Sequence, residues 1–300
     1  MTQSAPRLVI EIPLLLLLAL LWGSSYLYIK IAVAEIPPFT LIAFRVTIAS
    51  FFLGTVMIIK GERLPRDQKT WRMLLVQAMF LAIVAWTVLA WGQQFVDAGL
   101  ASVLNSTAPI FVFFITLMIT RHEAVSGLKL FGAVLGVAGV SLIMGVEALN
   151  GLGEQLAGQI AVLFAAVLYG CSAIYGKKFS HLSPVVTATG TMLWAAIWLV
   201  PASLMIDQPW TLQVSNRAML AALILAIFCT GGALLLYFRL VVTLGSMGVA
   251  SQAYLRAGVG VMLGVVLLGE TISPVVILGL FAAILGVIAI NIPARRKARA

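Results

Sequence analysis

Charged side chains are scarce in this chain of 300 residues: they make up 10% of it, whereas 62% of the residues are hydrophobic. A soluble protein carries about 25% charged residues. A chain so poor in charge cannot cover the surface of a water-soluble fold, which excludes a free cytosolic enzyme. Disordered chains are excluded too, because they need few apolar residues and many charges.

Cysteine and histidine occur only twice each. Cys171 and Cys229 lie inside apolar runs, where a small buried side chain is favoured over a disulfide. His122 and His181 lie in expected loops, and no Asp or Glu lies in the middle of an apolar run. With no Walker-type phosphate loop either, the usual parts of membrane proteases and ATPases are missing. We therefore expect no enzyme, no catalytic residue, no metal and no cofactor.

What the sequence does contain is long apolar runs, each close to the roughly 20 residues that a helix needs to cross a bilayer. They predict an all-α, polytopic membrane protein with ten transmembrane helices. The expected spans are 12–34, 38–59, 72–94, 98–119, 126–146, 157–176, 184–205, 217–239, 246–268 and 273–292.

The basic residues predict the orientation of these spans. If the N-terminus is cytoplasmic, 15 of the 19 Lys and Arg residues fall in cytoplasmic segments, and only Lys30 and Arg217 fall on the opposite side. This asymmetry follows the positive-inside rule. It accounts for the net charge of +9 without a nucleic-acid partner and predicts that both termini are cytoplasmic.

An internal repeat is visible at a spacing of 147 residues. Trp22-Gly23-Ser24-Ser25 is echoed by Tyr169-Gly170-Cys171-Ser172, and Gly139 by Gly286. Each half holds five spans, an odd number, so the second half must be inverted relative to the first. Inverted repeats are typical of secondary transporters, which bind substrate near the midplane between the halves. We expect a first repeat over 1–146, a linker over 147–156, and a second repeat with a basic tail over 157–300.

Three short segments extend this pattern: Trp22-Gly23-Ser24-Ser25, Ala101-Ser102 through Pro109, and Leu268-Gly269-Glu270. With them, nearly the whole chain resembles the ten-helix EamA branch of the drug/metabolite transporter superfamily, and within it the amino-acid exporters of the YddG type. The resemblance implies export of small metabolites across the bacterial inner membrane. The first half departs from it, because Thr120-Arg121-His122-Glu123 stands where the second half has Leu-Gly-Glu.

Arg256 is the sharpest candidate for a substrate-binding residue. It lies about ten residues into its span, roughly 15 Å from the end at 1.5 Å per residue, which is too deep for the side chain to reach water along the helix. One interpretation is a fixed positive charge that binds a substrate carboxylate. The other is a structural arginine bonded to helix carbonyls beside Tyr254 or Asn105. For Arg45, nearer the end of its span, we favour a structural role, either snorkelling outward or meeting Glu35.

Other polar and aromatic residues complete the predicted site. Asn105 belongs to a polar segment that precedes Pro109, where the missing N–H can bend the helix, and Gly258 occupies the equivalent region of the second repeat. Pro109 and Gly258 are therefore the predicted hinges, although small polar residues and glycines also serve in helix packing. The aromatic candidates for the cavity wall are Trp22, Tyr26, Trp86 and Tyr169.

Together these features predict a transporter that exports small metabolites, amino acids with aromatic or other apolar side chains, by alternating access through a central cavity. The alternatives are a membrane-embedded enzyme and a non-transporting structural protein. Expected partners are a small-molecule substrate and the lipid bilayer. Glycine stripes in the fifth and tenth spans favour packing within one chain, hence a monomer over a dimer.

Overall fold

The structure is a computed structural model that describes residues 8–115, 127–149, 153–237, 239–240, 252–271 and 273–291. Over these residues every regular element is a helix. The helices of the first repeat are α1 (Leu8–Val33), α2 (Pro38–Ile59), α3 (Gln68–Ala78), η1 (Met79–Ile83), α4 (Ala85–Phe95), α5 (Ala98–Ser106), α6 (Ala108–Ile115) and α7 (Gly127–Leu149).

The second repeat follows the same order. Its helices are α8 (Gly153–Gly176), η3 (Lys177–Phe179), α9 (Pro184–Ala202), η4 (Ser203–Asp207), η5 (Pro209–Thr211), α10 (Asn216–Ala226), η6 (Ile227–Gly232), α12 (Gln252–Leu268) and α13 (Pro274–Asn291).

These elements confirm the all-helical membrane architecture expected from the sequence. Within the described residues, seven helical segments are long and apolar enough to cross a bilayer, and shorter apolar helices lie within α7, α12 and α13. Helices are the solution that hydrocarbon imposes, because every backbone N–H and C=O must find its partner inside the chain.

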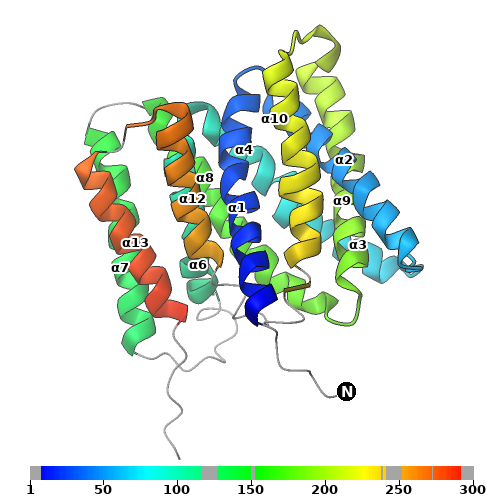
Figure 1. Ribbon diagram of the computed structural model, residues 1–300, viewed down its shortest axis with the longest axis horizontal. Coiled ribbons are helices and arrows are strands. Elements are labelled where there is room, and N and C mark those ends of the chain that lie inside the picture. Colours follow the sequence, from blue (N-terminus) through cyan, green and yellow to red (C-terminus); the bar gives the residue numbers. More distant parts are fainter. Residues whose placement is uncertain are drawn as a thin grey trace, which may run out of the picture.

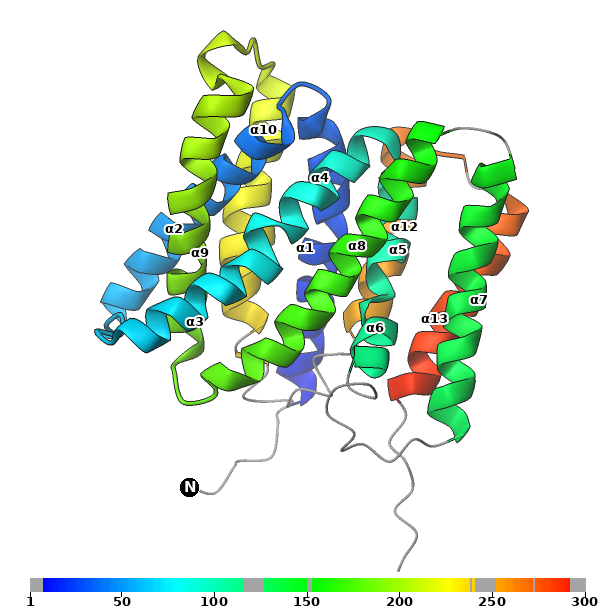
Figure 2. The ribbon, with the colours of Figure 1, turned by 180° about the vertical axis from the view of Figure 1, so that it is seen from behind.

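The glycine stripes lie where the outermost helices meet. Figures 1 and 2 show α7 and α13 side by side at one edge of the bundle. A Cβ added at Gly286 would lie 2.5 Å from the Gly132 oxygen and the Gly136 nitrogen, and one at Gly139 would lie 2.6 Å from the Gly279 oxygen. Backbones this close leave no room for a side chain, so the stripes join the two repeats within one chain.

Among the described residues, three apolar segments contain a π-helix, and two of these π-helices lie at matching places in the repeat. η1 interrupts the segment from α3 to α4, and η6 follows α10 in the equivalent segment of the second half. π-Helices frequently occur at functional sites. Here they precede Trp86 in one repeat and carry Thr230 in the other.

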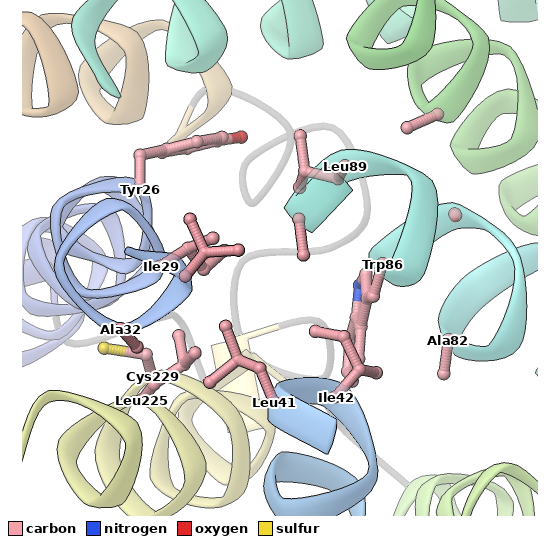
Figure 3. Packing of buried hydrophobic residues seen from close by; sticks show 14 of the residues in the cluster. Tyr26, Ile29, Ala32, Leu41, Ile42, Ala82, Trp86, Leu89, Leu225 and Cys229 are labelled. Carbon is pink, nitrogen blue, oxygen red and sulfur yellow. The ribbon is translucent and has the colours of Figure 1, made fainter. Parts of the chain in front are cut away.

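The main hydrophobic core runs through the middle of the bundle and draws on both repeats. In Figure 3, Tyr26 on α1 points toward Leu89 on α4, while the Trp86 indole lies beside Ile42 on α2. Leu225 and Cys229 of the second repeat lie near Ala32 of the first. Polar side chains inside this core are therefore held by helices of both halves.

Candidate functional site

Tyr26 and Asn105 meet at the centre of the core. Tyr26 is 2% exposed and Asn105 is 1% exposed, and the Asn105 Nδ2 donates a hydrogen bond of 2.6 Å to the Tyr26 hydroxyl. The Asn105 Oδ1 is buried with no hydrogen-bond partner among the described residues. An unsatisfied buried acceptor costs about 1–3 kcal/mol, so this oxygen is positioned to receive a donor from a bound molecule.

Arg45 lies in the same region, which differs from the sequence-based expectation. Its side chain does not snorkel outward or meet Glu35. Instead the Nε donates 2.7 Å to the Thr230 Oγ1, and the guanidinium carbon lies 3.8 Å from the centre of the Trp86 ring. The residue is only 5% exposed.

These two contacts leave Arg45 without a counter-charge, because one partner is a hydroxyl and the other an aromatic ring. No acidic side chain contacts Arg45 among the described residues. The guanidinium therefore retains the capacity to bind an anion.

Tyr169 and Arg256 bring the second repeat to this centre. Tyr169 packs against the core cluster that contains Tyr26 and Trp86, and Ala257, next to Arg256, belongs to that cluster. The Arg256 Nε is buried and has no hydrogen-bond partner in the described parts of the chain. Tyr26, Trp86 and Tyr169 thus belong to or pack against one core cluster. Arg45 joins it through Trp86, and Asn105 joins it through Tyr26.

The remaining predicted site residues are Trp22, Tyr254, Pro109 and Gly258. Trp22 packs on Tyr237 with ring centres 5.3 Å apart. The side chain of Tyr254 is outside the described residues.

The helix breaks at Thr107, between α5 and α6 and two residues before Pro109. At Gly258, α12 continues unbroken, and an added Cβ would meet nothing within 4 Å. Their roles as hinges stay predictions.

The two ends of the bundle differ in charge. The basic end carries Lys60, Arg63, Arg66, Lys69 and Arg72, which follow α2 and begin α3. A cavity of about 760 Å³ lies at this end, between α1 and α2 of the first repeat and α9 and the Asn216–Tyr237 segment of the second. Its walls are mostly aliphatic, and its charged lining residues are Lys60, Glu62 and Arg239.

Carboxylates hold the opposite end closed by bonding across the two repeats. Glu35 accepts the Ser215 N–H at 2.7 Å and its hydroxyl at 2.8 Å. Asp207 accepts the Thr40 N–H at 2.7 Å and its hydroxyl at 2.9 Å. Both contacts place an anion at the start of a helix, where the backbone dipole favours negative charge.

Glu270 makes the third of these contacts. Its two oxygens accept the N–H groups of Ala98 and Gly99, in the first turn of α5, at 2.7 and 2.9 Å. Gly269, with φ of +69°, supplies the left-handed turn that follows α12. We call these Glu35, Asp207 and Glu270 contacts the carboxylate clasp. The Leu268-Gly269-Glu270 motif thus has a structural role at the closed end.

The Ser215 N–H and hydroxyl lower the pKa of the exposed Glu35 below its ordinary value. Because this pKa is lowered, the contact stabilises the closed end at pH values above the ordinary carboxyl pKa. That stabilisation is lost as the pH falls through the pKa of Glu35 in the folded state. The Glu35 part of the clasp is therefore intact at neutral pH.

Comparison with known proteins finds one family that matches both halves of the chain. The model of the EamA-like transporter family matches residues 9–145 and 156–292, two segments that begin 147 residues apart. The spacing of the internal repeat is therefore confirmed.

The inner membrane transporter YedA of Escherichia coli (strain K12), described as uncharacterized, is 27% identical over 92% of this chain and 88% of its own length. The uncharacterized transporter YoaV of Bacillus subtilis (strain 168) is 26% identical over 73% of this chain and 75% of its own. One crystal structure with 17% identity has a TM-score of 0.69 and covers 95% of this chain and 98% of that one, which supports the fold.

Proposed function

Because this chain belongs to the EamA-like transporter family, we propose that it is a secondary transporter that exports small amino-acid-like metabolites by alternating access. The main support for this proposal is that the two ends of the bundle differ. A cavity lies at the basic end, and the carboxylate clasp links the two repeats at the other end. A bundle open at one end and closed at the other is the arrangement that alternating access requires.

The proposed binding site lies at the centre, between the cavity and the clasp. The unpaired donor at Arg256 suits a carboxylate, and the unpaired acceptor at Asn105 suits an ammonium group. Tyr26, Trp86 and Tyr169 add aromatic surface. These features favour an amino acid, and the apolar or aromatic side chain expected from the sequence stays a prediction.

The same proposal assigns the orientation. With the basic end in the cytoplasm, both termini are cytoplasmic and the cavity opens toward the cytoplasm, the side from which an exporter loads. The inner membrane is the location given for the relative YedA, and the positive-inside rule supports the orientation.

Transport by the purified protein tests the proposal. The described acidic residues lie at or near helix ends. We therefore expect that transport does not require protonation of a buried acid. Proteoliposomes loaded with a panel of amino acids should release them down the substrate gradient with equal pH on both sides. Empty liposomes provide the control. Release that depends completely on a pH gradient would contradict the absence of a proton-carrying site.

A further inference from the structure

The positive charge at the centre of the bundle exceeds what a neutral amino acid needs. Arg45 comes from α2 of the first repeat and lies against Trp86 in the main core. Arg256 comes from α12 of the second repeat, where the next residue, Ala257, belongs to the same core cluster. The Arg256 carbonyl oxygen would lie 2.9 Å from a Cβ at Gly23, one turn before Tyr26 on α1. A substrate with a single carboxylate, bound at Arg256, leaves Arg45 without a counter-charge. The contacts of Arg45 itself are a hydroxyl and an aromatic ring.

The acidic side chains that the structure describes do not supply that counter-charge. Within the described residues, Glu35, Asp207 and Glu270 are engaged in the clasp, and Glu11 pairs with Arg239 at 3.2 Å. Glu62, Asp67, Asp97 and Glu154 lie at the ends of helices or in loops. The core around Arg45 and Arg256 thus has two cations and no described acid.

We infer that the substrate carries two acidic groups, one bound by Arg256 and the other by Arg45, so that the transported class is acidic amino acids and related dicarboxylates. The planar guanidinium of Arg45 bonds Thr230 through Nε alone, which leaves its two Nη groups to form a fork with a carboxylate. Trp86 covers one face of that guanidinium and holds it in place. The Asn105 Oδ1 remains available for the ammonium of an amino acid. This inference rests on the proposed transport function and replaces the apolar or aromatic substrate side chain expected from the sequence with an acidic one.

Two features link this centre to the cavity. Phe228 and Gly232 line the cavity, and Thr230 lies between them on the same π-helix and holds Arg45. Movement of η6 is thus coupled directly to the position of the guanidinium. A substrate arriving from the basic end meets Arg45 through the element that forms the cavity wall.

The test uses glutamate and glutamine, which have nearly the same shape and differ in one acidic group. Release from proteoliposomes at equal pH is measured for both, with phenylalanine as the apolar reference. We expect wild-type protein to release glutamate at least about tenfold faster than glutamine or phenylalanine. The amide of glutamine and the ring of phenylalanine leave unpaired the arginine that binds the second carboxylate. Arg45→Gln should bring the glutamate-to-glutamine ratio close to one. Arg66→Gln, which removes an exposed arginine from the loop between α2 and α3, should leave it unchanged.

The outcomes separate this inference from the proposed function. Equal or faster release of glutamine or phenylalanine by wild-type protein would overturn the dicarboxylate class and leave amino-acid transport standing. No release of any amino acid would overturn both. If Arg45→Gln does not fold, the wild-type glutamate-to-glutamine ratio alone decides. A stable Arg45→Gln protein that keeps the wild-type ratio would remove Arg45 from the site.

Discussion

Replacement of Arg256 by alanine is expected to abolish transport while the protein remains inserted and folded. A charge near the bilayer centre costs about 2.5–3.5 kcal/mol on insertion scales, so removing it does not weaken the fold by itself. What is lost is the donor whose Nε has no partner among the described residues. Arg256→Lys should retain partial transport with weaker apparent affinity, because an ammonium keeps the charge and loses the two-pronged geometry.

Transport and thermal unfolding of the purified variants are the measurements for Arg256. Arg66→Ala is the matched control, since Arg66 is exposed and lies in the loop between α2 and α3. If Arg256 only supports the structure, both variants will unfold at markedly lower temperature or fail to express. A stable Arg256→Ala protein with unchanged substrate affinity would show that Arg256 does not bind the carboxylate.

Replacement of Glu270 by glutamine should open the closed end and reduce transport about tenfold. The carboxylate accepts two N–H groups from the first turn of α5, whereas an amide presents one oxygen and an NH2 group that cannot accept. Losing one hydrogen bond to a charged group costs about 1.5–3 kcal/mol, or roughly a factor of ten in the balance between closed and open states at the lower value. The Glu270→Gln protein should also unfold at lower temperature.

Glu154→Gln provides the control for Glu270. Glu154 is an exposed acid in the first turn of its own helix, α8, and makes no contact with the other repeat among the described residues. Its substitution should change neither transport nor the unfolding temperature. Wild-type transport and stability in Glu270→Gln would show that the contact with Ala98 and Gly99 does not hold the end closed.

Hydropathy and spacing were sufficient to predict the helices and the repeat. The bilayer fixes the length of an apolar span, and the 147-residue spacing reappears in the two segments that match the family model. The aromatic and polar candidates Tyr26, Trp86, Asn105 and Tyr169 also lie together, because large or polar side chains deep in a span face the bundle interior.

Arg45 shows where prediction from the sequence was wrong. Its depth along α2 is compatible with snorkelling, and nothing in the local sequence indicates that Thr230 and Trp86 lie beside it, since these residues come from distant helices. The π-helices were missed for a related reason: η1 and η6 are apolar like their surroundings and do not change the hydropathy pattern.

Spin-label distances at the two ends test the central claim of alternating access most directly. One pair, at Ala34 and Gln213, spans the clasp. The other, at Leu20 and Arg63, spans the cavity between α1 and the segment that follows α2; all four residues are exposed. Adding glutamate should populate a second state in which the clasp pair is longer and the cavity pair is shorter. Distances that stay fixed, or that lengthen at both ends together, would contradict alternating access.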